Sequence, residues 1–379
     1  MSPSAVPIRV LLVEDSPVAL AILKKTLEAA PGIDVVGEAK TGKEALTLIP
    51  QLDPQVICTD LHMPHMDGLA LTQTVMANYP RPILVLSISV QTQNTERIFQ
   101  LLEAGAVDIL AKPVSGLTAA DSSLNKALIE KIRILAGVRV FKKKAKVSSV
   151  SAFPQPRPTG VKRPRIIGIG ASTGGPQALH VLLSQLPKDC PPVVCVQHIS
   201  VGFLPGLVGW LQRDCAADIT IAQAGDRPTP GRVYFAPSEC HLKLDTRGRF
   251  ERVENTPAVD GHRPSITVTF ESLAQYYGQR VVGILLTGMG QDGATGLKKI
   301  REAGGFTIAQ DEETSVVFGM PQVAIELGAA RQVLPIEAIT PKLTQILLNP
   351  TSANAPRQDV PDHLTTPNTL RANLLEGNL

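Results

Sequence analysis

Residues 8–16 read IRVLLVEDS, an apolar run that ends in two acidic residues and a serine. A run that is apolar on both faces is typical of a strand buried in a parallel sheet. Four comparable runs follow, at residues 33–39, 55–59, 81–87 and 106–111. Segments with helical spacing lie between them, and the last helix is predicted near residues 120–135. This alternation predicts an α/β domain, flavodoxin-like, of five βα units with strand order 2-1-3-4-5.

A second α/β region follows a change in composition. Residues 142–165 are rich in Lys, Pro and Ser and lack apolar periodicity, which predicts a linker. Beyond it, strands are predicted at residues 165–170, 192–197, 218–223, 232–237, 281–287 and 306–310, with the spacing of a mainly parallel, doubly wound sheet. The chain of 379 residues therefore divides into a first domain (1–125), a helix end and linker (126–161), a second domain (162–350) and a tail expected to be mobile (351–379).

Composition restricts the classes of function. An apolar fraction of 44%, a charged fraction of 19% and a net charge of +3 are typical of a folded globular protein and do not suggest nucleic-acid binding. No apolar run approaches the roughly 20 residues that span a bilayer, so we expect a cytoplasmic protein without membrane insertion. The five cysteines form no CxxC pair and are expected to be buried free thiols.

Three carboxylates are predicted to meet in the first domain. Glu14 and Asp15 follow the first strand and Asp60 ends the third, and these two strands are neighbours in the predicted order. Crowded carboxylates repel one another, and Mg²⁺, a hard cation with oxygen ligands, relieves that repulsion. Ser87 and Lys112 lie at the ends of the fourth and fifth strands and offer a hydroxyl and an ammonium to phosphoryl oxygens. Asp60 is then the predicted nucleophile towards phosphorus.

Each of these acids alone would be interpreted as a helix cap or a turn residue. Their joint placement favours a pocket that binds a phosphoryl group, and the surrounding motifs support the same interpretation. The segments LLVEDSP (11–17), CTDLHMPHMDGL (58–69), LSIS (86–89) and AKP (111–113) resemble a response-regulator receiver domain. The resemblance implies that Asp60 accepts a phosphoryl group from a histidine kinase. One departure is Ile109, which stands where many receivers carry an aromatic switch residue.

The same resemblance implies a role for each remaining pocket residue. Glu14 and Asp15 would form the acidic metal pocket, with Mg²⁺ coordinated by Asp15, Asp60 and the His62 carbonyl. Ser87 and Lys112 match the switch hydroxyl and the lysine of the family.

A glycine-rich turn follows the first strand of the second domain. The sequence GIGASTGGP, residues 168–176, predicts a sharp strand-to-helix turn that presents Ser172 above the sheet. Its glycines also mimic a dinucleotide-binding fingerprint, which requires an acidic residue at the tip of the next strand. That strand ends in Gln197 and His198 instead. A histidine there can take the serine proton as general base, although a lone loop histidine is more often only hydrogen-bonded.

A third strand end supplies a carboxylate. The buried run at residues 281–287 leads into a glycine-rich loop that carries Asp292. Its carboxylate can orient His198 and stabilise the imidazolium, which completes a Ser-His-Asp triad with Ser172. In isolation, an Asp-Gly pair indicates only a turn. Three residues of complementary type at strand ends favour catalysis.

These motifs together resemble the catalytic domain of the chemotaxis protein-glutamate methylesterase family. They are IGASTGGPQAL (169–179), VQHIS (196–200), YFAPSECHL (234–242), GHRPSI (261–266), LTGMGQDGA (286–294) and QDEETSVVFGMPQVAI (310–325). The resemblance implies Ser172 as nucleophile, His198 as base and Asp292 as orienting acid, with Thr173 and the Met289 amide as oxyanion contacts.

Some positions of the second domain carry weaker implications. Thr267 replaces the usual Asp of the family, and we expect that change to affect the groove or its packing rather than the triad. His241, His262 and Arg263 are expected only to shape the groove. No ligand spacing for zinc is present, so the second domain is expected to need no cofactor.

The implied activity is hydrolysis of glutamate 5-O-methyl esters on chemoreceptors, releasing methanol, with deamidation of glutamine as a related activity. The unphosphorylated receiver is expected to cover the substrate groove, and phosphorylation of Asp60 is expected to uncover it. The protein is expected to be a monomer. Two alternatives stay open: a signalling adaptor whose hydrolase site is inactive, and a receiver joined to a nucleotide-dependent oxidoreductase.

Overall fold

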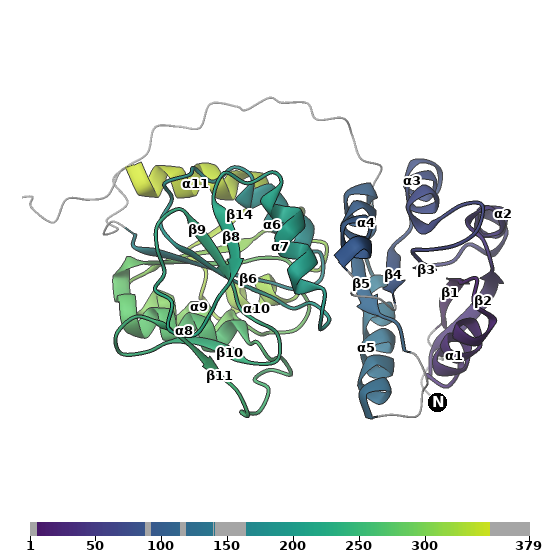
Figure 1. The fold of residues 1–379 in the computed structure, drawn as a ribbon, viewed down its shortest axis with the longest axis horizontal. Coiled ribbons are helices and arrows are strands. Elements are labelled where there is room, and N and C mark those ends of the chain that lie inside the picture. Colours follow the sequence, from purple (N-terminus) through teal and green to yellow (C-terminus); the bar gives the residue numbers. More distant parts are fainter. Residues whose placement is uncertain (1–5, 88–91, 114–118, 139, 141–163, 349–379) are drawn as a thin grey trace, which may run out of the picture.

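Two α/β domains make up the part of the chain that the computed structural model describes, residues 6–87, 92–113, 119–138, 140 and 164–348 (Figure 1). The predicted tail (351–379) and most of the predicted linker lie outside these residues. The predicted boundary at residue 125 falls inside the helix α5, which spans Ala119–Leu135.

The first domain is a five-stranded sheet with the order β2-β1-β3-β4-β5, in which every pair is parallel, as predicted. Its elements are β1 (Ile8–Val13), α1 (Pro17–Glu28), β2 (Ile33–Ala39), α2 (Gly42–Leu52), β3 (Val56–Asp60), α3 (Gly68–Asn78), β4 (Ile83–Ser87), α4 (Thr92–Ala104), β5 (Asp108–Ala111) and α5. All five predicted strands and the last helix are confirmed. Local sequence begins the helices: the Ser16, Thr41 and Asp67 side chains cap α1, α2 and α3 by accepting backbone N–H groups.

The second domain is a seven-stranded sheet with the order β14-β13-β12-β6-β7-β9-β8, again parallel at every pair. Its elements are β6 (Ile166–Ala171), α6 (Gly175–Leu183), β7 (Val193–Gln197), α7 (Leu204–Gln212), β8 (Asp218–Ile221), β9 (Arg232–Phe235), β10 (His241–Leu244), β11 (Phe250–Val253), α8 (Ile266–Tyr277), a 3-10 turn (Gly278–Arg280), β12 (Val281–Leu285), α9 (Ala294–Glu302), β13 (Phe306–Gln310), α10 (Met320–Glu326), β14 (Gln332–Leu334) and α11 (Ile336–Leu348). The antiparallel hairpin β10–β11 and the edge strand β14 were not predicted.

The glycines of β6 serve helix packing. A Cβ atom built on Gly170 would lie 2.3 Å from the Ile266 Cγ2 of α8, so only glycine lets α8 approach the strand this closely. The glycine pattern that mimics a dinucleotide fingerprint therefore has a packing cause in this fold.

Helices α4 and α5 stand on the side of the first domain that faces the second (Figure 1). Helix α4 packs against α7, where the Phe99 and Trp210 rings stack with centroids 5.4 Å apart. The Trp210 Nε1–H donates to Glu103 Oε1 at 2.5 Å, and Gln177 Nε2 of α6 donates to the Ala106 carbonyl at 2.7 Å. Stacked rings and partly buried hydrogen bonds of this kind stabilise the contact between the two domains.

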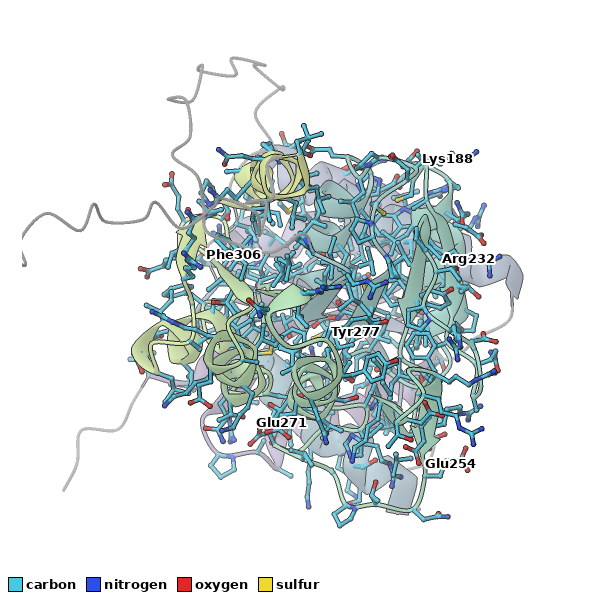
Figure 2. All side chains as sticks on the ribbon, turned by 90° about the vertical axis from the view of Figure 1, so that its left-hand side faces the viewer. Lys188, Arg232, Glu254, Glu271, Tyr277 and Phe306 are labelled. Carbon is cyan, nitrogen blue, oxygen red and sulfur yellow. The ribbon has the colours of Figure 1, made fainter. Side chains whose placement is uncertain are left out.

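The face of the second domain turned away from the first carries both signs of charge, as the exposed Lys188, Arg232, Glu254 and Glu271 in Figure 2 illustrate. Such mixed charge is typical of a solvated surface. Within the described residues, no helix is long and apolar enough to cross a membrane. All five cysteines are free thiols; four are buried as predicted, and Cys215 is only partly buried.

Candidate phosphoacceptor pocket and active site

The three predicted carboxylates meet at the carboxyl ends of β1 and β3. Ligand atoms of Glu14, Asp15 and Asp60 all lie within 4.8 Å of one another. The buried Lys112 Nζ lies 2.6 Å from Glu14 Oε2 and 2.9 Å from Asp60 Oδ2. The parallel pairing of β3 with both β1 and β4 brings these strand ends together.

Asp60 is more exposed to solvent than Glu14 and Lys112, the two buried residues of this pocket. Its side chain is 14% exposed, whereas those of Glu14 and Lys112 are 2% and 1% exposed. Burial raises the pKa of Glu14, and the adjacent Asp60 charge adds to that rise, while Lys112 opposes it. An added cation would therefore be favoured here, because it offsets the repulsion among the carboxylates and favours the ionised form of Glu14. The oxygen-only donor set fits Mg²⁺.

Ser87 ends β4 and is buried, and its carbonyl accepts the Lys112 backbone N–H at 3.0 Å. Ile109 is buried in β5 and supplies no aromatic ring. The role of the His62 carbonyl stays a prediction. The segment after β4, residues 88–91, lies outside the described residues, and so does Ser89 of the LSIS motif.

Three adjacent strands position the predicted hydrolase residues. Ser172 follows β6, His198 follows β7, and Asp292 lies in the loop after β12. The register pairs Ala171 with Gln197 across β6 and β7, so Ser172 and His198 leave the sheet side by side. The strand order reverses at β6, which is where ligand sites form in open α/β sheets.

Gln197 fixes the two loops against each other. Its buried side-chain amide donates to the Ser172 carbonyl and to the His198 carbonyl, both at 2.8 Å. The His198 N–H in turn donates to the Ala171 carbonyl at 3.0 Å. The residue that stands in place of a ribose-binding acid therefore supports the serine and the histidine.

Asp292 is buried and fully hydrogen-bonded. Its Oδ2 accepts His198 Nε2–H at 3.0 Å and the Ile266 N–H at 2.8 Å, and its Oδ1 accepts the Thr267 N–H at 2.9 Å. Ile266 and Thr267 open α8, so the carboxylate lies at the positive end of a helix. Burial alone would raise the pKa of Asp292, but the bonds from His198 and from these N–H groups lower it to about 2. The carboxylate stays ionised.

His198 has one nitrogen committed and one free. Because Asp292 is a carboxylate, Nε2 is the protonated nitrogen of the pair. Nδ1 is buried and has no hydrogen-bond partner among the described residues. A buried, unpaired acceptor is costly unless a reacting group uses it. No hydrogen bond joins Ser172 to His198 in this part of the chain, and such bonds are often long before substrate binds.

The two oxyanion candidates are Thr173, which directly follows Ser172, and the backbone N–H of Met289. The Met289 N–H makes no hydrogen bond within the described residues and remains available to a ligand. Gly288 lies against the serine: a Cβ atom there would meet Ser172 Cβ at 2.6 Å. Thr173 is buried, and its carbonyl accepts the Thr287 hydroxyl at 3.0 Å.

One residue near Asp292 was missed by the sequence analysis. The Thr267 backbone N–H binds Asp292, and its hydroxyl accepts the Gly293 N–H at 2.7 Å, while the expected effect of a threonine at this position stays a prediction. The missed residue is Ser265, whose hydroxyl donates to Asp292 Oδ1 at 2.8 Å and also caps α8. A serine directly before a helical pattern was the available signal.

The residues expected to shape the groove have distinct contacts. His241 is buried, accepts the Ser265 N–H at Nδ1 and lies 3.1 Å from the Pro257 carbonyl through Nε2. Arg263 donates to the Thr256 carbonyl at 2.8 Å. His241 thus supports the residue that supports Asp292.

A receiver residue reaches the hydrolase site. Lys131 of α5 donates to the Thr173 hydroxyl at 2.6 Å and forms an ion pair with Asp108 of β5. Ala111, at the end of β5, donates its N–H to the Ser200 hydroxyl at 3.4 Å, two residues beyond His198. The α5 and β5 side of the receiver therefore contacts the loops that carry Ser172 and His198.

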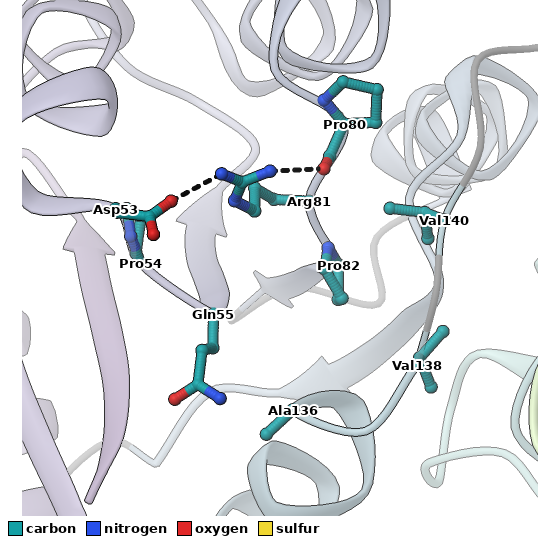
Figure 3. Close-up of a pocket in the computed structure, with 9 residues that line it drawn as sticks. All are labelled: Asp53, Pro54, Gln55, Pro80, Arg81, Pro82, Ala136, Val138 and Val140. Carbon is teal, nitrogen blue, oxygen red and sulfur yellow. Dashed lines mark hydrogen bonds and ion pairs between the residues drawn. The ribbon is translucent and has the colours of Figure 1, made fainter. Parts of the chain in front are cut away.

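A separate hollow of about 350 Å³ lies at the other end of the receiver sheet, before β3 and β4 (Figure 3). Asp53 and Arg81 form an ion pair on its rim at 2.5 Å, and prolines and the valines after α5 line it. None of the predicted site residues lines this hollow.

Taken together, the fold and the site define a response-regulator receiver joined to an α/β domain with a Ser, His and Asp constellation. Residues 10–119 match the family model of the response regulator receiver domain, and residues 167–343 match that of the CheB methylesterase. The chain belongs to the family of receiver-linked CheB protein-glutamate methylesterases.

Curated relatives match over nearly their whole length. A protein-glutamate methylesterase/protein-glutamine glutaminase of Geobacter metallireducens is 39% identical over 344 residues, covering 90% of this chain and 99% of the relative. One of Anaeromyxobacter dehalogenans is 42% identical over 342 residues, covering 90% and 97%. Among solved structures, the Thermotoga maritima CheB methylesterase catalytic domain is 38% identical, covers 48% of this chain and 98% of its own, and gives a TM-score of 0.47.

Proposed function

We propose that the protein hydrolyses glutamate 5-O-methyl esters on chemoreceptors, and the corresponding glutamine amides, with Ser172, His198 and Asp292 as its catalytic residues. The observation that carries this proposal is the His198–Asp292 bond beside Ser172, with the other imidazole nitrogen buried and unpaired. The relatives are named for both activities. Ester and amide hydrolysis share one acyl-enzyme route.

The proposed reaction uses the unpaired Nδ1 of His198 as the general base. Ser172 Oγ attacks the ester carbonyl carbon while His198 Nδ1 takes its proton, and Asp292 stabilises the imidazolium. The N–H of Met289, with Thr173, receives the oxyanion. The imidazolium then protonates the leaving methoxide, which gives methanol and a glutamyl ester on Ser172. Water, deprotonated by Nδ1, attacks that ester and restores the glutamate carboxylate and the serine.

The orientation of His198 reverses the common serine-protease arrangement. There the carboxylate holds Nδ1 and the serine faces Nε2. Here Nε2 is held by Asp292. The roles are the same, because only the geometry of the three groups defines the triad.

The receiver pocket is proposed to accept a phosphoryl group on Asp60 from a histidine kinase. Bound Mg²⁺, held by Asp15, Asp60 and the His62 carbonyl, would neutralise phosphoryl oxygens during the transfer. Lys112 Nζ, 2.9 Å from Asp60, would bind one phosphoryl oxygen, and Ser87 would offer its hydroxyl from the neighbouring strand end. The Asp60 Oδ1 already accepts the Leu61 N–H at 2.7 Å, which holds the carboxylate in place.

The docked receiver is proposed to be the inhibited state. Lys131 donates a hydrogen bond to the hydroxyl of Thr173, the residue after the proposed nucleophile. The stack of Phe99 on Trp210 holds α4 against α7. A charge added at Asp60 would bias the β4–β5 side of the receiver towards a second packing state. Receptor helices would then reach Ser172.

Methanol release from methylated receptor membranes tests the activity. The full chain with Mg²⁺ and acetyl phosphate is expected to release methanol, and Ser172→Ala to release none above the uncatalysed rate. Full activity of Ser172→Ala would exclude the nucleophile assignment. A wild-type chain without activity would favour the adaptor alternative, and binding of NAD(P) measured by calorimetry would favour the oxidoreductase alternative.

The metal and the phosphoacceptor are tested in the same assay. Chelation of Mg²⁺ or an Asp60→Asn substitution is expected to remove the response to acetyl phosphate while the basal rate stays unchanged, because neither touches the hydrolase site. Activation that persists in Asp60→Asn would contradict the assignment.

A further inference from the structure

A second imidazole lies on the proposed base. The ring of His262 stacks on that of His198 with centroids 3.7 Å apart and an angle of 17° between the planes. No step of the mechanism above uses His262, and its ring nitrogens have no hydrogen-bond partner among the described residues. The side-chain contact that the structure gives to His262 is therefore through its ring face.

The backbone of His262 is held in a tight turn. His262 and Val259 exchange two backbone hydrogen bonds, at 2.9 and 3.1 Å. Between them, Asp260 and Gly261 both have positive φ, 50° and 80°, as in the two-residue turns of tight hairpins. Asp-Gly is the residue pair that such a turn favours, so local sequence fixes the backbone from which the ring projects.

The same turn is tied to the loop of the catalytic acid. Gln291 Nε2 donates to Asp260 Oδ1 at 2.9 Å, and Gln291 directly precedes Asp292. His262 and Asp292 thus hold His198 from two sides, one by its face and one by Nε2. The Gln291–Asp260 bond joins the loops that carry the two supports.

The stacked ring is electrically neutral. Burial lowers the pKa of His262 to about 4, with further lowering by His198 and Lys131 and opposition from Asp292. A neutral aromatic face attracts a cation, whereas a second imidazolium would repel one. The ring therefore favours the imidazolium that forms on His198 during turnover.

We propose that His262 is a positioning residue for hydrolysis: its neutral ring holds the His198 plane, which keeps Nε2 on Asp292 and Nδ1 towards Ser172. The inference rests on the proposed Ser-His-Asp chemistry. A flat ring at 3.7 Å opposes tilting of His198 out of that plane and excludes water from one of its faces. Small misplacements of a catalytic group cost large factors in rate.

Four variants of the full chain test the proposal, assayed for methanol release with Mg²⁺ and acetyl phosphate. His262→Ala, which removes the ring, is expected to lower kcat about 10-fold or more and to leave KM within about 2-fold. His262→Phe keeps a neutral flat ring and is expected to restore kcat to within about 3-fold of the wild type. Arg263→Ala removes a hydrogen bond of the same loop without touching the stack, and it is expected to lower kcat less than His262→Ala does, which measures the effect of loosening the loop. Ser172→Ala reports on the proposed function itself.

The outcomes separate the two proposals. His262→Phe as slow as His262→Ala would overturn the inference, since the ring nitrogens rather than the ring face would then matter. His262→Ala with the kcat of the wild type, or a loss in Arg263→Ala equal to that in His262→Ala, would overturn it as well. In each case an inactive Ser172→Ala leaves the proposed function standing, whereas an active one removes the basis of both.

Discussion

His198 Nε2 lies 3.0 Å from Asp292 Oδ2, while Nδ1 of the same ring is buried without a partner among the described residues. In the proposed mechanism, this pairing leaves Nδ1 for proton transfer and gives Asp292 the role of setting the tautomer. The first of the predictions below follows from the four groups that bind this carboxylate.

An Asp292→Asn substitution should lower kcat by about 10⁴-fold, because the amide no longer fixes the protonated nitrogen or stabilises the imidazolium. Ser265→Ala removes one hydrogen bond to Oδ1 together with the side-chain cap of α8, and it should lower kcat about 10-fold. Steady-state methanol release measures both. A Ser265→Ala variant as inactive as Asp292→Asn would show that the hydroxyl does more than support the carboxylate.

Stability should fall on acidification because of His262. Its folded-state pKa of about 4 lies below the ordinary value of 6.5, so between these values the unfolded chain binds a proton that the folded chain does not. The free energy of unfolding should therefore drop as pH falls from 6.5 to 4, by at most about 3 kcal/mol from this group. Urea midpoints at pH 7 and at pH 4.5 measure the drop. The drop in the free energy of unfolding should be smaller in His262→Phe, because phenylalanine does not bind a proton. An equal drop in the wild type and in His262→Phe would show that other groups cause it.

Removal of the Lys131 contact should release the hydrolase from the receiver. Lys131→Met loses the hydrogen bond to Thr173, so the basal rate without phosphorylation should rise about 5-fold or more, and the further gain from acetyl phosphate should shrink. Lys126→Met is the matched control, since Lys126 is an exposed lysine of the same helix. Equal basal rates in the two variants would show that Lys131 does not restrain the site.

The packing beside the nucleophile gives a further prediction. Gly288→Ala would place a Cβ atom 2.6 Å from Ser172 Cβ and 2.8 Å from the Met320 side chain. Overpacking of this kind typically costs about 1–3 kcal/mol, and here it also displaces the serine, so activity should be lost even where the chain stays folded. Gly209→Ala in α7 has no atom within 4 Å of the new Cβ and should behave like the wild type. Thermal unfolding and methanol release, measured on the same samples, separate the two effects.

Sequence patterns predicted both sheets because strands buried on two faces appear as continuous apolar runs. They failed for β10, β11 and β14, which have three or four residues each and lie partly exposed. In β14, for example, Val333 is exposed between two partly exposed neighbours, so no apolar run marks the strand. Such short elements form because neighbouring strands and helices provide partners, not because of their own sequence.

Only part of the candidate site was predictable from the sequence. Ser172, His198 and Asp292 follow strands whose order places them together, and the strands themselves were readable from the sequence. Lys131 was not, because an isolated lysine on a helix gives no sign of which domain it will face. The stack of His262 on His198 depends on a turn 64 residues further along the chain, beyond any local pattern. Contacts of this kind come from tertiary packing.

Chemical labelling of Ser172 with a fluorophosphonate tests most directly the claim that the receiver controls access to the nucleophile. The label needs no receptor, and mass spectrometry locates it on the chain. With Mg²⁺ and acetyl phosphate, the wild-type chain should be labelled at Ser172 faster than without them, by about 5-fold or more, and Asp60→Asn should show no such gain. Labelling of Ser172 at one rate in both states, or labelling at another residue, would contradict the account.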